Sequence, residues 1–125
     1  MSKHTPDHPA VWVEIPVTDM DRSRKFYEAV TTMELKEDNT GPNPMAVFQS
    51  KDPAAGVSGH LYPGKPAADG GNTIHLSVPK PLESVLERVK QNGGTVESDI
   101  MTIPPGQFAY CKDPDGNSVG FFVYN

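Results

Sequence analysis

The amino-acid sequence predicts an α+β fold made of two modules, each with the order strand, helix and then three strands. Three observations support this prediction. Short runs of β-branched and aromatic residues, typical of strands, recur along both halves of the chain. Apolar residues at helical spacing follow the first run of each half. The halves also match one another residue by residue at a shift of 61 positions.

The first half opens with a strand over residues 11–17, a run rich in valine that ends beside Pro16. Thr18 and Asp21 have the spacing of a capping box, and apolar residues then return at helical spacing, which predicts a helix to about Val30. Three further strands are expected, over residues 33–37, 45–50 and 57–62. Proline, glycine and asparagine are frequent between them, as in turns.

The second half repeats this order, beginning with a strand over residues 73–78. Pro81 lies where the first turn of a helix tolerates proline. The helix after it carries an apolar stripe and ends at glycine. The stripe consists of Leu82, Val85, Leu86 and Val89, and the end is Asn92-Gly93-Gly94. Three strands follow over residues 95–98, 107–112 and 118–124, and residues 113–117 predict a hairpin turn between the last two.

Identical residues at a shift of 61 indicate that one module was duplicated. The repeated pieces are Lys51-Asp52-Pro53 with Lys112-Asp113-Pro114, Val17 with Val78, and Gly59 with Gly120. The same shift pairs Trp12 with Thr73 and Glu14 with His75. We therefore expect a single domain over residues 10–125, with modules at about 10–65 and 70–125. A polar leader over residues 1–9, with two prolines, is expected to be flexible.

Composition excludes several classes of function. The chain has 125 residues, a net charge of −5 and no run of basic residues, so neither nucleic acid nor an anionic membrane is expected as a partner. Cys111 is the single cysteine and cannot close an internal disulfide. The first nine residues lack the apolar core of a signal peptide, and a cytoplasmic location is expected.

Several motifs together resemble the vicinal oxygen chelate superfamily, which includes glyoxalase I, bleomycin-resistance proteins and extradiol dioxygenases. The motifs are the stretch from Glu14 to Ser23 leading into Phe26-Tyr27, then Gly93-Gly94, then the stretch from Lys112 to Asn117. The resemblance covers residues from about 10 to 124. It implies two βαβββ modules whose sheets form a curved mixed sheet around a central cleft, with the helices outside. It also supplies a precedent for a homodimer.

In metal-dependent members, the resemblance places one ligand on the first and one on the last strand of each module. Those places fall on Trp12, Gly59, Thr73 and Gly120. Indole, hydroxyl and bare backbone are poor ligands for Zn²⁺, Ni²⁺ or Fe²⁺. No metal and no cofactor are therefore expected, and glyoxalase I activity is not expected.

Strand parity puts Glu14 on the face of Trp12 and His75 on the face of Thr73, so both are expected to point into the cleft. In direct contact they would form a general acid/base pair, or a buried pair that only fixes the modules in register. His60 has the opposite parity to Gly59 and would need a bulge to join them. With that bulge, His60, His75 and Glu14 would make a relocated metal site.

The sequence thus predicts a glyoxalase-like protein that binds a small planar or carbonyl-bearing molecule between its modules. The expected ligand-binding residues are Trp12, Thr73, Gly59, Gly120 and Phe122, and the expected catalytic residues are His75 and Glu14. Metal-free lyase or isomerase chemistry is left open. The alternatives are a sequestering, resistance-type binder and a metal-dependent lyase or dioxygenase with relocated ligands. Whether a second chain completes the cleft is also left open.

Overall fold

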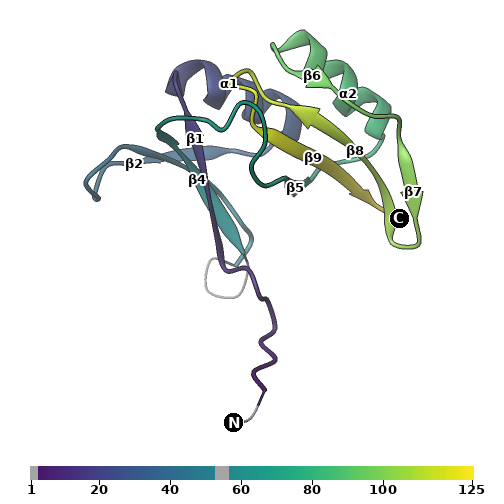
Figure 1. Cartoon of the computed structure of the whole chain (residues 1–125), viewed down its shortest axis with the longest axis horizontal. Coiled ribbons are helices and arrows are strands. Elements are labelled where there is room, and N and C mark those ends of the chain that lie inside the picture. The colour runs from purple at the N-terminus through teal and green to yellow at the C-terminus, as the bar shows by residue number, and fades with distance from the viewer. Residues whose placement is uncertain (1–2, 53–56) are drawn as a thin grey trace.

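The computed structural model describes residues 3–52 and 57–125. Within these ranges the chain forms two helices and two β-sheets (Figure 1). The first sheet has the order β1 (Trp12–Val17), β4 (Ser58–Pro63), β3 (Met45–Phe48) and β2 (Leu35–Asp38). The second has the order β5 (Ile74–Ser77), β9 (Ser118–Tyr124), β8 (Gly106–Lys112) and β6 (Thr95–Val96), with β7 (Met101–Ile103) also paired to β8.

The predicted α+β class and the repeated element order are confirmed. Helix α1 (Met20–Thr31) follows β1, and α2 (Leu82–Gln91) follows β5. In both sheets the first strand runs parallel to the last strand of its module, β1 to β4 and β5 to β9. Strand β7 was not predicted. It is three residues long and joins β8 through Pro104 and Pro105, so its hairpin carries none of the Asn-Gly or Asp-Gly signals of a turn.

The start of α1 differs from the prediction by one residue. Asp19, not Thr18, is the N-cap, and its carboxylate accepts the backbone N–H of Arg22 at 3.1 Å. The Thr18 hydroxyl is instead bonded to Asp115, far along the sequence. The Thr18 side chain therefore makes a tertiary contact and does not cap the helix.

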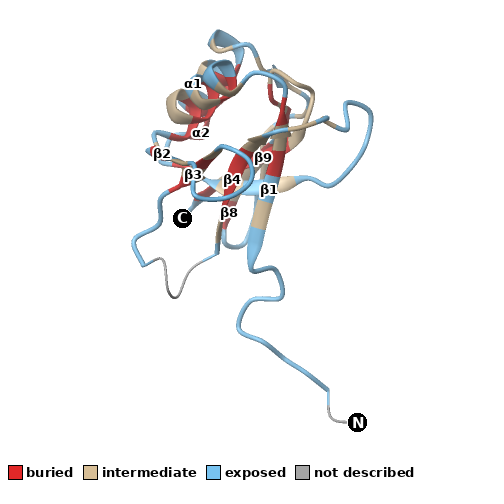
Figure 2. Ribbon diagram, turned by 90° about the vertical axis from the view of Figure 1, so that its left-hand side faces the viewer, coloured by how far each residue is buried: buried red, intermediate tan, exposed pale blue. Residues whose placement is uncertain are grey.

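One hydrophobic core within the described ranges contains residues from both sheets and both helices. Helix α1 contacts α2 and β4, and α2 contacts β6, β8 and β9, so one face of each sheet is covered and the other is free of helices. Figure 2 shows the buried positions concentrated where the helices meet the strands, whereas the segment before β1 is exposed. Neither helix in the described part of the chain is long and apolar enough to cross a membrane.

Strand register corrects the 61-residue repeat in its last strand. Glu14 lies opposite His60, and His75 lies opposite Gly120. The first strands match at a shift of 61, but the last strands match at 60, so His60 and not Gly59 is the structural counterpart of Gly120. A slip of one residue exchanges the two faces of a strand.

Candidate functional site

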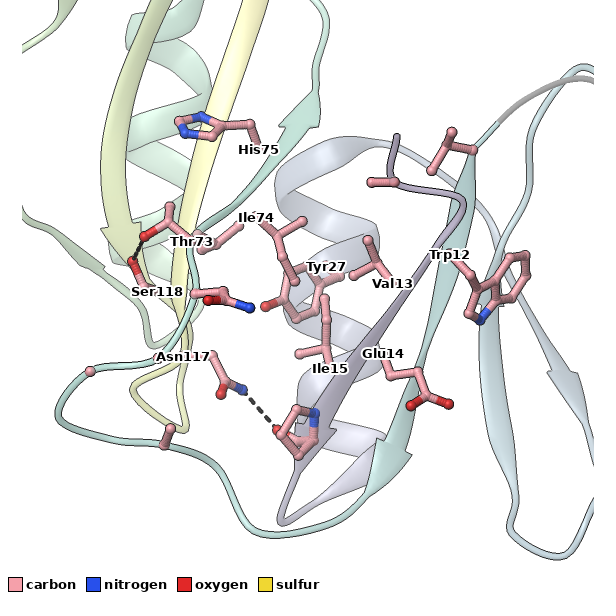
Figure 3. A pocket seen from close by; sticks show the side chains of 18 of the residues that line it. Trp12, Val13, Glu14, Ile15, Tyr27, Thr73, Ile74, His75, Asn117 and Ser118 are labelled. Atoms are coloured by element: carbon pink, nitrogen blue, oxygen red, sulfur yellow. Dashed lines mark hydrogen bonds between the residues drawn. The ribbon is translucent and has the colours of Figure 1, made fainter. Parts of the chain in front are cut away.

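A groove of about 830 Å³ lies between β1 and β5, and we call it the inter-module groove. Small-molecule sites commonly measure roughly 300–1,000 Å³. Its floor is apolar, and Figure 3 shows Val13 and Ile15 of β1 and Ile74 from β5 between the strands with Tyr27 of α1 behind them. Polar residues also line it, namely Lys65, Asn72, Asn117 and Ser118. The groove therefore offers an apolar floor beside polar walls.

Four predicted site residues border this groove, but their side chains turn away from it. Figure 3 shows Trp12 and Glu14 pointing away from β5, and Thr73 and His75 pointing away from β1. The expected contact between Glu14 and His75 is therefore wrong. Parity put each side chain on the helix-free face of its own sheet, and in this chain those two faces are directed away from each other.

The walls of the groove are consequently made of main chain. Strands β1 and β5 are edge strands of their sheets. Val17 C=O accepts the N–H of Gly64 beside β4, so alternation directs the main-chain groups of Trp12 and Glu14 to the other side, into the groove. Val78 N–H donates to Phe122 of β9 in the same way, which directs the main-chain groups of His75 into the groove. Each wall thus presents N–H donors and C=O acceptors.

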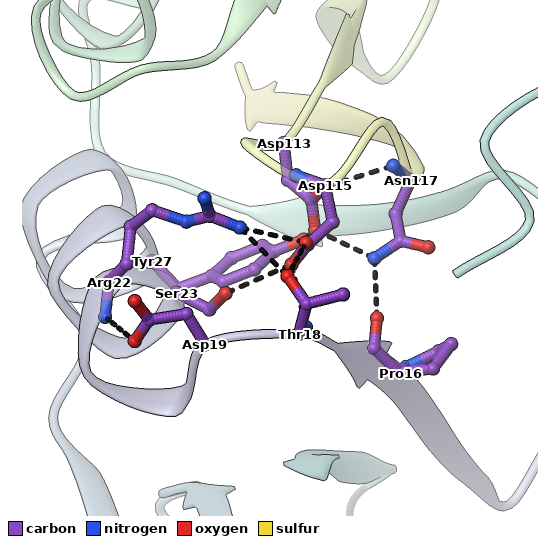
Figure 4. Close-up of polar contacts among 9 residues, drawn as sticks. All are labelled: Pro16, Thr18, Asp19, Arg22, Ser23, Tyr27, Asp113, Asp115 and Asn117. Atoms are coloured by element: carbon purple, nitrogen blue, oxygen red, sulfur yellow. Dashed lines mark hydrogen bonds and ion pairs between the residues drawn. The ribbon is translucent and has the colours of Figure 1, made fainter. Parts of the chain in front are cut away.

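Polar contacts between the modules close one end of the groove (Figure 4). The Asn117 side-chain amide donates to Pro16 C=O at 2.8 Å and to Asp113 at 2.9 Å. Asp115, whose side chain is 4% exposed, accepts the backbone N–H of Thr18 at 3.2 Å and pairs with Arg22 at 2.8 Å. These contacts fix the hairpin between β8 and β9 against the start of α1, and hence the spacing of the walls.

The Tyr27 hydroxyl is part of the same closed end. It donates to Asp113 Oδ2 at 2.7 Å, and the whole side chain is buried. Burial raises the pKa of Tyr27 well above its usual value, and the negative charge of Asp113 and the hydrogen bond to it raise it further. The phenol is therefore a neutral donor held in place, and it is not available as a base.

His60 lies on the helix-free face of the first sheet without any bulge, because it pairs directly with Glu14. His60 does have the opposite parity to Gly59, but the predicted need for a bulge is wrong, because His60 and not Gly59 shares the face of Glu14. Trp12 Nε1–H donates to His60 Nδ1 at 2.9 Å, and His60 Nε2 lies 3.5 Å from a Glu14 oxygen. An indole nitrogen can only donate, so Nδ1 acts as the acceptor and the ring proton lies on Nε2, facing Glu14.

Gly59 occupies the position opposite Val13, where a Cβ atom would lie 2.3 Å from the Val13 carbonyl oxygen. Its glycine identity thus serves close packing of two strands. Gly59 also borders a second hollow of about 250 Å³, which shares Val13, Ile74 and His75 with the inter-module groove.

The helix-free face of the second sheet carries a row of rings. His75 contacts Phe108 and Tyr110 edge-on, with ring centres 5.5 and 5.6 Å apart. Phe122 stacks on Phe108 at 6.0 Å. Gly120 lies under His75, since a Cβ there would be 2.2 Å from the imidazole Nδ1. The space at Gly120, expected to admit a ligand, is therefore filled by a neighbouring ring.

The Thr73 hydroxyl lies 2.5 Å from the Ser118 hydroxyl, and this bond ties the start of β5 to β9. Sequence reasoning missed Tyr27 and Asn117 as residues of the groove, together with Tyr110 beside His75. Local sequence patterns could not have found them, because each comes from a different part of the chain from the strand it approaches.

A family model for the glyoxalase/bleomycin resistance protein/dioxygenase superfamily matches residues 7–121. The chain belongs to this superfamily. A glyoxylase-like domain-containing protein from Didymella fabae is 28% identical over 115 residues, covering 85% of this chain and 86% of that protein.

Several solved structures share the fold of this chain. A glyoxalase/bleomycin resistance protein from Albidiferax ferrireducens T118 aligns with a TM-score of 0.68 and 23% identity, covering 92% of this chain and 98% of that one. An antibiotic-binding protein from Streptomyces sp. CB03234 aligns at 0.65 and 22%, covering 98% and 100%. A fosfomycin resistance protein from Mesorhizobium loti aligns at 0.62 and 16%, covering 95% and 92%.

The possible metal ligands in the described part of the chain do not come together as one site. Among the described residues, no three His, Cys, Asp or Glu side chains are grouped as ligands. Glu14 and His60 are neighbours, but His75, the third member of the relocated set, lies on the other sheet among aromatic rings.

Proposed function

We propose that this superfamily member binds a small planar or carbonyl-bearing molecule in the inter-module groove. The observation that carries the proposal is the groove itself, about 830 Å³ with an apolar floor and hydrogen-bonding main chain on both walls. A flat, apolar body would rest on Val13, Ile15 and Ile74. A carbonyl oxygen would accept from an N–H of either wall.

We propose that the groove binds its ligand without converting it chemically. The side chains of Glu14 and His75 turn away from the groove, and the Tyr27 phenol is held by Asp113 (Figure 3). General acid/base catalysis needs a titratable group within hydrogen-bond reach of the reacting atom. Proteins of the same fold include ones named for antibiotic binding and for fosfomycin resistance, and sequestration of a toxic compound in the cytoplasm is the role we propose here.

A thermal-shift screen of planar carbonyl compounds and antibiotics tests this function, because a ligand that binds only the native state raises the melting temperature. Asn72 is exposed and lines the groove, so Asn72→Trp should fill it and abolish the shift. Asn39→Trp, an exposed asparagine between β2 and β3, is the matched control and should keep the shift. Hits that bind both variants equally would place the ligand elsewhere and contradict the proposal.

A second candidate function uses the helix-free faces and a second copy of the chain. Large aromatic side chains are exposed on both faces, with Trp12 at 48% and Tyr110 at 38%. In a homodimer, the first-sheet face of one copy would cover the second-sheet face of the other. Glu14 and Trp12 would then face His75 and Phe122 across a cleft, where His75 could transfer a proton with help from Glu14.

Sedimentation at several protein concentrations tests this candidate. It predicts a dimer that Trp12→Ala weakens, and turnover of a bound compound that both His75→Ala and Glu14→Gln abolish. A monomer at all concentrations, or turnover that survives both substitutions, would contradict it.

A further inference from the structure

The walls of the inter-module groove are two strand edges that face one another. Main-chain groups of Trp12 and Glu14 line one wall, and those of Thr73 and His75 line the other. A strand edge is a template for pairing with another extended chain. Pro16 is consistent with an unpaired edge on β1, because proline occurs in a strand where its missing N–H would have faced away from the ladder. A ligand between the edges can therefore pair on both sides.

An amide already bridges the two modules at the closed end of the groove. The Asn117 side-chain amide donates across to Pro16 C=O of β1, the next main-chain group along that wall after Glu14 (Figure 4). This carboxamide supplies the hydrogen bond that a ligand amide would supply one position farther along. The wall is thus shown to accept an amide donor from the opposite module's side.

The apolar floor of the groove restricts which side chains a bound peptide can place against it. An extended peptide directs alternate side chains to opposite faces. One set would lie on the apolar floor formed by Val13 and Ile74, and the other would face solvent past the polar residues Asn72 and Lys65. A peptide that alternates apolar and polar residues satisfies both faces.

We infer that the ligand of the inter-module groove is an extended, amide-bearing compound, a short peptide or peptide-like molecule, that pairs with the edges of β1 and β5 and joins the two sheets. This inference rests on the proposed function and narrows its ligand class. Main-chain pairing supplies the affinity, as in peptide recognition by strand addition, and the apolar floor selects alternate side chains.

The probe is the blocked tetrapeptide acetyl-Val-Thr-Val-Thr-amide, titrated against the ¹⁵N-labelled full chain and followed by amide NMR shifts. The control probe has the same sequence with N-methyl groups on both valines, which removes donors and keeps the side chains. We expect shifts concentrated at Trp12, Glu14, Thr73 and His75, and binding at least about tenfold weaker for the methylated probe. Equal binding of the two probes would overturn the inference.

A variant pair tests the wall itself. Glu14→Pro removes a main-chain donor that faces the groove and leaves the ladder to β4 intact, whereas Asn39→Pro, at an exposed residue between β2 and β3, places the same residue type outside the groove. We expect peptide binding to weaken about tenfold in the first variant and to be unchanged in the second. Should Glu14→Pro fail to fold, the comparison of methylated and unmethylated probes decides alone.

Failure of this inference can be told apart from failure of the proposed function. If the tetrapeptide does not bind but a planar carbonyl compound does, and Asn72→Trp abolishes that binding, the ligand class proposed here is wrong and the groove stands as the site. If neither compound class binds in the groove, both proposals are wrong.

Discussion

Tyr27 shows how one side chain serves both the core and the groove. It is fully buried, its ring forms part of the groove floor, and its hydroxyl donates to Asp113 at 2.7 Å. We expect Tyr27→Phe to lower the free energy of unfolding by about 1–3 kcal/mol, because Asp113 loses a charged hydrogen bond in a buried place. Urea denaturation measures the change. An unchanged midpoint would show that the bond contributes little.

Cys111 predicts a loss of stability at alkaline pH. Burial raises the pKa of its thiol to about 11 from 9.0, and the nearby Glu97 adds to the effect. The unfolded thiol ionises at lower pH than the folded thiol, so the folded state loses stability as pH rises from about 9 to about 11. Tyr27 acts in the same direction, since its pKa is also raised.

The comparison of wild type with Cys111→Ala across this pH range isolates the thiol. Cys111→Ala should lose less stability than wild type between the two pH values, although it starts lower because of the cavity it creates. Native protein at pH 8 should also resist alkylation by iodoacetamide, since the thiol is neutral and buried. Parallel pH curves for the two proteins, or fast alkylation of the native state, would contradict this account.

At the scale of the elements, the two glycines of the parallel strand pairs have different reasons to be glycine. A Cβ at Gly59 would lie 2.3 Å from a main-chain oxygen of Val13, whereas a Cβ at Gly120 would meet the movable ring of His75. We expect Gly59→Ala to cost about 1–3 kcal/mol or more, and Gly120→Ala to cost less.

A double-mutant cycle checks the second case. In a His75→Ala background, the cost of Gly120→Ala should almost disappear, since the atom it strikes has been removed. Additive effects of Gly120→Ala and His75→Ala would mean that the glycine is needed for the backbone itself. Unfolding free energies from chemical denaturation of the four proteins give the answer.

The elements could be predicted from the sequence because each follows from a local pattern. Ten of the eleven helices and strands in the described chain match predicted runs, and only the short β7 has no local signal. The predicted direction of side chains was wrong where it depended on the 61-residue repeat. A slip of one residue in the last strands turned His60 to the face assigned to Gly59, and no periodicity within either strand records that slip.

At the scale of the whole molecule, the candidate site depends on how two sheets are placed relative to one another. Parity put Glu14 and His75 on their correct faces, but could not show that those faces are directed apart. Trp12 and Thr73 line the groove as predicted, but their side chains point away from it and their main chain borders it. That placement follows from the α1 to α2 packing and the contacts of Asp113 and Asp115, which join distant parts of the sequence.

Amide hydrogen exchange on the ligand-free protein measures whether the edges of β1 and β5 are open to a ligand. The amides of Glu14 and His75 should exchange far faster than those of their neighbours Ile15 and Leu76, whose N–H groups are directed to β4 and β9. Slow exchange at Glu14 and His75 as well would mean that the two strands already pair with one another, and would contradict the existence of an open groove between the modules.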